Sequence, residues 1–252
     1  MFRLQAMRFL RSCLVILSLT TAIAIPCSAA KPKFPPDTQR LVKNPGHIRR
    51  ALAPDYWALS PYYEGQDSVA GASVATTSMV LNAIRANRDL RSDDELVTQR
   101  GLLARVKSPA WHIAVSAGRN EVPLELMKPV LEEALRAYAI QGYTIELFQP
   151  EENLEKFKQA FHRALVENEK SADDFLIVSF IQGILTGSEH VGQIAPIAAF
   201  DAQKKRVLIF DPDRQWYEPY WALEAQLVQA MVQKPADPNS KTRGFIWLRK
   251  KK

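Results

Sequence analysis

The sequence has very little cysteine. Its two cysteines, Cys13 and Cys27, both lie within the first thirty of 252 residues, so the rest of the chain has neither a thiol nor a disulfide partner. Thiol chemistry in that remaining part is therefore excluded, because a thiol nucleophile requires cysteine. Long apolar runs are also missing, since no stretch approaches the roughly 20 residues that a membrane-spanning helix needs. We accordingly expect no membrane span in the mature chain.

The first thirty residues have the pattern of a secretory signal. Three arginines without an acidic residue are followed by an uncharged, mostly apolar segment over Cys13–Ile25, and then by small residues that suit a signal peptidase. We expect residues 1–30 to be removed and the exported chain, secreted or periplasmic, to begin near Lys31. A retained N-terminal anchor is the alternative.

The remaining charge does not favour a nucleic-acid partner. The net charge of +6 includes the three signal arginines, so the mature chain carries about +3. Residues 249–252 form a basic tail, but the other charges are interspersed and no basic and aromatic residues alternate along a strand. His47, His112 and His162 show no pair with metal-ligand spacing, and His162 is expected at the surface.

The apolar periodicity predicts helices first and a sheet later. After an extended lead-in over 31–54, residues 55–248 form a single domain, followed by the basic tail at 249–252. Helices are expected over 72–88, with Ser73 as a cap, over 92–106, opened by a capping box at Ser92–Glu95, and over 123–141, 151–169 and about 221–232. Strands are expected over 143–148, 175–181, 194–200, 207–210 and 244–248. This order predicts an α+β domain.

Three segments carry a resemblance to a known family. Gln66–Ile84 (QDSVAGASVATTSMVLNAI) resembles the segment around the nucleophile of the phytochelatin synthase family, which belongs to the papain-like superfamily. Gly192–Asp201 (GQIAPIAAFD) and Val207–Trp221 (VLIFDPDRQWYEPYW) are similar to two later motifs of that family. The resemblance covers most of the chain from Tyr56 to about Met231. It implies a papain-like fold, with a helical N-terminal half packed against an antiparallel sheet from the C-terminal half.

The resemblance also assigns roles to single positions. The family's nucleophilic cysteine corresponds to Ala72, its general-base histidine to Gln193 and its orienting aspartate to Asp211, eighteen residues after Gln193. The oxyanion-hole glutamine corresponds to Gln66, six residues before Ala72. A methyl group cannot attack a carbonyl and a carboxamide does not titrate, so no acyl-enzyme can form by the family's route.

The resemblance therefore implies a pseudoenzyme. Working members of the family cleave glutathione at its Cys–Gly bond and transfer or hydrolyse the γ-Glu-Cys unit, often with heavy metals involved. We expect this chain to bind glutathione or a related γ-glutamyl peptide and to need no cofactor. Two alternatives stay open: an active enzyme that uses Ser73 and His190, and a scaffold or partner-binding protein.

Two further clusters of side chains are candidate sites. Glu189 and His190 with Asp211 and Asp213 are a weaker alternative for a metal site, and we assign none. The aromatic residues Trp216, Tyr217, Tyr220 and Trp221 fit loop packing better than the wall of a ligand cleft. Asp211 itself is either a retained functional carboxylate or a strand-end cap that Gln193 can still hydrogen-bond.

Overall fold

The computed structural model describes residues 32–251, apart from 69–70, 87, 90, 118–121, 151–152, 189–190 and 234–242. Its strands are β1 (Gln39–Arg40), β2 (Tyr143–Phe148), β3 (Phe175–Ile181), β4 (Gly192–Asp201), β5 (Arg206–Ile209), β6 (Tyr220–Leu223) and β7 (Gly244–Lys250). They form a sheet in the order β1-β6-β5-β4-β3-β7-β2, in which neighbours run antiparallel. The α+β prediction is confirmed.

Helices precede and interrupt the sheet. The α-helices are α1 (Gly46–Arg50), α2 (Pro54–Leu59), α3 (Ala72–Ala86), α4 (Gln99–Arg105), α5 (Pro109–Ser116), α6 (Leu124–Ala137), α7 (Leu154–Asn168), α8 (Gln182–Thr186) and α9 (Glu224–Val232). Short 3₁₀ turns occur at Leu41–Lys43 and Ser60–Tyr62. No helix among the described residues has the length and apolar character needed to cross a bilayer.

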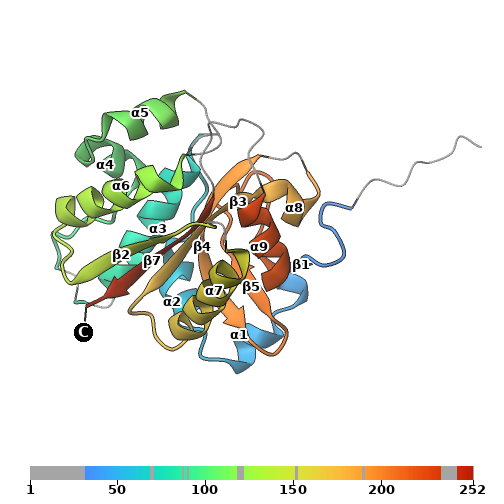
Figure 1. Cartoon of the computed structure of the whole chain (residues 1–252). Coiled ribbons are helices and arrows are strands. Elements are labelled where there is room, and N and C mark those ends of the chain that lie inside the picture. Colours follow the sequence, from blue (N-terminus) through green and yellow to red (C-terminus); the bar gives the residue numbers. More distant parts are fainter. Residues whose placement is uncertain are drawn as a thin grey trace, which may run out of the picture. The chain divides into compact units, whose positions relative to one another are not determined.

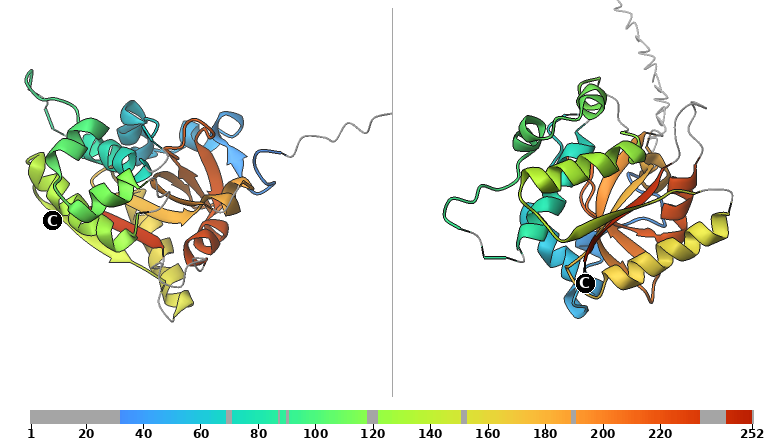
Figure 2. Two further views of the ribbon diagram at one scale, coloured as in Figure 1. Left: turned by 90° about the horizontal axis from the view of Figure 1, so that it is seen from above. Right: turned by 60° about the vertical axis from the view of Figure 1, so that its left-hand side comes forward.

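Helices cover both faces of the sheet. Figures 1 and 2 show α3 and α6 on one side, and α7 and α9 on the other. This arrangement explains the apolar run of strand β3. Phe175 and Ile177 pack into the core beneath α3 and α6, whereas Leu176 and Val178 pack beneath α7 and α9. A strand buried on both faces needs apolar residues at successive positions.

Most predicted elements form close to the expected bounds. The strands over 143–148 and 175–181 were placed to the residue, and the helix expected over 72–88 is α3. Ser73 lies inside α3 rather than before it, so it does not cap this helix. The region near 221–232 begins as strand β6 and becomes helical only at Glu224.

The capping box at Ser92–Glu95 was wrong. Helix α4 begins at Gln99, and Thr98 is its N-cap, with a side chain that accepts a hydrogen bond from the Gly101 N–H. Asp94 instead binds the guanidinium groups of Arg85 and Arg88, at 3.3 and 3.2 Å. The same carboxylate accepts a hydrogen bond from the Arg91 N–H at 2.9 Å, and the Glu95 carboxylate expected in the box lies 3.5 Å from Arg105. These contacts belong to a turn before α4 and not to the start of a helix.

The segment expected as an extended lead-in has structure of its own. β1 pairs with β6, through Gln39 opposite Trp221 and Arg40 opposite Tyr220. Helix α1 follows, and His47 within it lies 3.5 Å from both Glu169 and Asp201. These contacts attach the start of the described chain to the sheet.

Candidate functional site

Helix α3 brings the expected nucleophile position against the sheet. Ala72 is the first residue of α3 and only 4% exposed. One turn later, the Thr76 hydroxyl donates to the Ile194 carbonyl at 2.9 Å. Since Ile194 follows Gln193 on β4, this hydrogen bond attaches the start of α3 beside the expected base position.

Gln193 and Asp211 are in direct contact. The Gln193 Nε2 donates to Asp211 Oδ1 at 2.9 Å, and the Gln193 Oε1 accepts from the Ile194 N–H at 3.1 Å. Asp211 comes two residues after the end of β5, whose end is attached to β4 because the Phe210 N–H donates to the Pro196 carbonyl. The carboxamide therefore donates to the carboxylate, as an imidazole N–H does in a working triad.

Asp211 is the centre of a buried hydrogen-bond network. Besides Gln193, its carboxylate accepts from Gln182 Nε2 at 2.9 Å, from the Tyr220 hydroxyl at 2.8 Å and from the Asp213 N–H at 3.0 Å. Complete burial is the larger effect and raises the pKa of Asp211 above its ordinary value. The four donors partly oppose this increase, because they stabilise the charged form. Gln182 and Tyr220 were not assigned as partners from the sequence, because only the fold brings them to this carboxylate.

The loop with Gln66 is fixed on two sides. The Gln66 N–H donates to the carbonyl of Pro212, the residue after Asp211, at 2.8 Å. The carboxamide of Gln99 then spans the loop, donating to the Gly65 carbonyl at 2.8 Å and accepting from the Asp67 N–H at 3.0 Å. Gln99 is 4% exposed and had no role in the sequence analysis.

A pocket of about 300 Å³ opens beside this network. Four carboxamides, two acidic side chains and an exposed tryptophan are among the residues that line it: Gln66, Asp67, Ser68, Gln182, Val191, Gly192, Gln193, Asp213, Gln215 and Trp216. Carboxamides both donate and accept hydrogen bonds, which suits peptide groups. The pocket is thus equipped to bind an amide-containing ligand, and the described residues that line it include neither a thiol nor an imidazole.

The alternative nucleophile Ser73 faces elsewhere. Its hydroxyl is 1% exposed and accepts a hydrogen bond from Trp111 Nε1 at 3.0 Å, and it does not line the pocket. His190, its expected base, lies outside the described residues. Of the other histidines, His112 contacts the Val106 carbonyl and His162 contacts Glu224, so neither belongs to this site.

The aromatic cluster divides between the two roles considered for it. Trp216 is 58% exposed and lines the pocket, whereas Tyr217 and Tyr220 are buried and pack near Phe34. Trp221 is also buried, with its ring edge-on to His47. One aromatic side chain thus reaches the pocket and three contribute to packing.

No group of three or more potential metal ligands occurs within the described part of the chain. Glu189, which with His190 was the basis of the weaker metal alternative, likewise lies outside that part. The Asp211 carboxylate, which was also part of that alternative, accepts hydrogen bonds from Gln182, Gln193, Tyr220 and the Asp213 N–H.

Comparison with known proteins agrees with this geometry. A family model described as phytochelatin synthase matches residues 46–245, which include α3, β4 and the end of β5. Among curated proteins, a sequence comparison found no match. The matched region covers well over half of the chain and contains Gln66, Ala72, Gln193 and Asp211. The chain belongs to the phytochelatin synthase family, and the papain-like assignment of its α+β fold rests on that membership.

Proposed function

We propose that this protein is an exported phytochelatin synthase-like pseudoenzyme, which binds glutathione or a related γ-glutamyl peptide without cleaving it. The observation that supports this proposal best is the hydrogen bond from Gln193 to Asp211 at 2.9 Å. The pair retains the arrangement of base and orienting carboxylate, but the base position carries no titratable nitrogen. With a methyl group at Ala72, the nucleophile is missing as well.

The chemical loss is large. Acyl transfer from a thiol needs a thiolate and an imidazole that accepts and returns the proton. Removing a member of such a triad costs several powers of ten in rate. With two members replaced, only binding and polarisation of a carbonyl group remain.

The contacts around the pocket support a binding role. Thr76 fixes the start of α3 to β4, and Gln99 fixes the loop that carries Gln66. The pocket beside them has carboxamides that can pair with the peptide groups of a short γ-glutamyl peptide. The N-terminus of α3, a helix of fifteen residues, is an additional electrostatic attraction for a carboxylate.

Restoring the two missing groups tests this proposal. Purified mature protein and the double variant Ala72→Cys/Gln193→His are incubated with glutathione, and released glycine is measured. We expect no release by the parent and measurable release by the double variant. Each single variant should remain inactive, because Ala72→Cys alone has a thiol without a base and Gln193→His alone has a base without a thiol.

Binding is measured separately by isothermal titration with glutathione and with a peptide that has an ordinary α-linkage in place of the γ-linkage. The proposal expects the parent to bind glutathione more tightly. Release of glycine by the parent contradicts the pseudoenzyme assignment and directs attention to Ser73 and His190. A parent that binds neither peptide, together with an inert double variant, contradicts the ligand-binding role.

A scaffold function is the second candidate, and one observation favours it. Ala72 and Gln193 are each 4% exposed, so the positions expected for the nucleophile and the base offer little surface to a ligand. In that case glutathione has no effect on thermal stability.

Export is part of the same proposal, although residues 1–30 lie outside the described part of the chain. We propose cleavage near Lys31 and a location outside the cytoplasm. Mass spectrometry of the protein from a periplasmic fraction would identify the first residue. A mature chain that still begins at Met1 contradicts cleavage. The heavy-metal involvement known for the family remains a resemblance, and we derive no metal-dependent step.

A further inference from the structure

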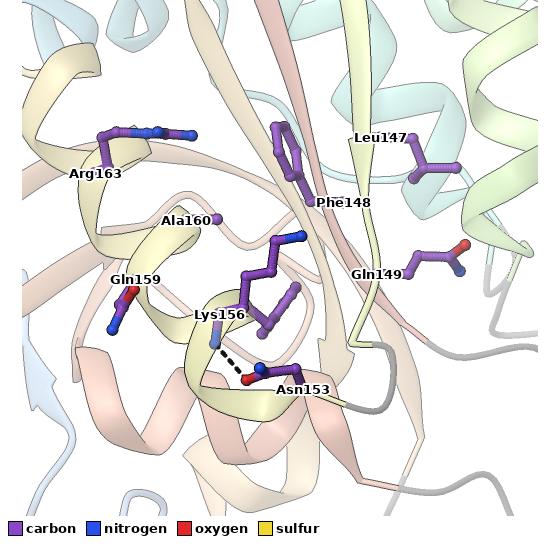
Figure 3. Close-up of a pocket in the computed structure, with 9 residues that line it drawn as sticks. Leu147, Phe148, Gln149, Asn153, Lys156, Gln159, Ala160 and Arg163 are labelled. Carbon is purple, nitrogen blue, oxygen red and sulfur yellow. Dashed lines mark hydrogen bonds between the residues drawn. The ribbon is translucent and has the colours of Figure 1, made fainter.

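A groove of about 570 Å³ runs between α7 and β2, away from the pocket beside Asp211 (Figure 3). We call it the α7–β2 groove. It is lined by Leu147, Phe148, Gln149, Asn153, Lys156, Phe157, Gln159, Ala160 and Arg163. These residues belong to the edge of the sheet and to one side of α7, and none of them has a role in the proposed function.

The groove is cationic. Figure 3 shows Lys156 and Arg163 extending from α7 toward Phe148. Both side chains belong to exposed residues, and neither forms an ion pair with another described residue. None of the described residues that line the groove is acidic, and the Glu125 carboxylate beside it accepts a hydrogen bond from Gln149 at 2.9 Å. Lys158 on the same helix differs, because its Nζ lies 2.6 Å from Glu155. The two groove cations are thus available to an anionic partner.

The sheet ends at this groove with a free edge. Among the described strands β2 pairs with β7 alone, over all six of its residues. In an antiparallel pair about half of the main-chain N–H and C=O groups point away from the neighbour, so the outer edge of β2 presents unpaired groups. Leu147 points away from α7 in Figure 3, and it therefore presents its main chain to the groove.

The floor between edge and helix is aromatic. Phe148 points toward α7 and stacks on Phe245 with ring centroids 4.5 Å apart. Phe157 packs against the same Phe245 ring at 5.7 Å. Glu146 is the acidic residue on this face of β2, and Arg249 binds it at 3.1 Å. An apolar side chain on Phe148, flanked by two acidic ones, therefore complements the groove.

We propose that an extended acidic segment of a partner protein adds to the sheet as a strand along the free edge of β2. Lys156 and Arg163 are seven residues apart on α7, about 10 Å along its axis. In a strand, same-face residues lie about 7 Å apart at i and i+2 and about 13 Å apart at i and i+4. Long side chains bridge the difference, so the segment carries the pattern acid–x–apolar–x–acid. Main-chain pairing supplies affinity and the alternate side chains supply specificity.

The probe is a synthetic strand peptide with glutamate, leucine and glutamate on one face and threonine on the other, blocked at both ends. Binding to the full mature chain is measured by fluorescence anisotropy at two salt concentrations. A second peptide has glutamine in place of glutamate, and a third is N-methylated at the amides that would pair with β2. We expect the first peptide to bind at least about tenfold more tightly than either of the others.

Charge reversal on the protein completes the test. Lys156→Glu and Arg163→Glu should each weaken binding of the acidic peptide about tenfold, and the matched control Lys158→Glu on the same helix should change it less than about twofold. All three side chains belong to α7 and lie outside the core, so folding, checked by circular dichroism, should persist.

Three results overturn the proposal. Equal binding of the glutamate and glutamine peptides removes the charge complementarity, and full binding by the N-methylated peptide removes strand addition. Concentration-dependent dimerisation that Lys156→Glu abolishes assigns the edge to a second copy of this chain instead. Loss of glutathione binding at the other pocket would leave this proposal unaffected, because the two sites share no residue.

Discussion

Asp55 offers the sharpest test of the energetics of this fold. It lies in the first turn of α2 with no exposed surface, and its Oδ2 accepts a hydrogen bond from Nδ2 of Asn168, which is itself only 2% exposed. Asp55 Oδ1 and Asn168 Oδ1 have no hydrogen-bond partner among the described residues. Protonation gives Asp55 a hydroxyl that can donate a hydrogen bond, whereas the carboxylate can only accept one.

The pKa of Asp55 supports the same conclusion. Burial raises this pKa well above the ordinary 3.8, and the hydrogen bond from Asn168 only partly opposes the increase. The negative charges of Asp174 and Glu169 raise it further. The folded state therefore holds the proton more tightly than the unfolded chain does.

The sign of the pH dependence follows by linkage. Between the unfolded pKa near 3.8 and the raised folded pKa, the folded protein binds more protons, so the free energy of unfolding falls as the pH rises. The slope from this one group approaches about 1.4 kcal/mol per pH unit inside that window. Asp55→Asn keeps the shape of the neutral acid and removes the titration. We expect the variant to be more stable than the parent above the window, with a difference that vanishes near pH 4.

Urea unfolding followed by tryptophan fluorescence from pH 4 to 8 measures this difference. Asp93→Asn is the matched control, because Asp93 is exposed and paired with Arg91 at the surface, where such pairs contribute little. A stability difference for Asp55→Asn that does not change with pH refutes the argument. So does a variant that is less stable than the parent at pH 8.

Two further predictions concern the candidate site. Asp211→Ala leaves the donors of Gln182, Gln193 and Tyr220 buried without an acceptor. In chemical denaturation we expect it to lower the free energy of unfolding by about 3–5 kcal/mol, and Asp211→Asn to lower it by less. Equal losses for the two variants would contradict the hydrogen-bond network. Gln99→Ala removes the two hydrogen bonds by which Gln99 holds the Gln66 loop and leaves the bond from the Gln66 N–H to the Pro212 carbonyl in place. It should cost about 1–3 kcal/mol and weaken glutathione binding in titration calorimetry. Unchanged values in both assays would show that the loop does not need Gln99.

Local patterns predicted the buried strands well and the helix starts less well. The run over 175–181 is apolar throughout because both of its faces are covered, and such a run leaves little choice of structure. The expected capping box failed because Glu95 is held by two arginines, each ten residues away: Arg85 donates to its carbonyl and Arg105 contacts its carboxylate. The strand β1 was missed for a similar reason: two residues form a strand only because β6 is there to pair with them.

The site shows the same division. The resemblance to the family's motifs assigned roles to Ala72, Gln193 and Asp211, and the structure brings Gln193 and Asp211 together. The remaining partners of Asp211 were not predicted, since Gln182 stands at the junction of β3 and α8 and Tyr220 in β6. Neither has a sequence signal of its own, because its role depends on two distant segments meeting at one carboxylate.

The burial of Asp211 explains why a glutamine at position 193 suits this network. Asp211 is fully buried, and a buried charge is tolerated only with donors around it. An apolar side chain at position 193 would remove one of those donors, whereas glutamine still donates at 2.9 Å. The carboxamide thus preserves the network while it removes the proton transfer that the family's mechanism requires. Because the supporting hydrogen bonds remain in place, replacing two side chains is a fair test of whether chemistry alone has been lost.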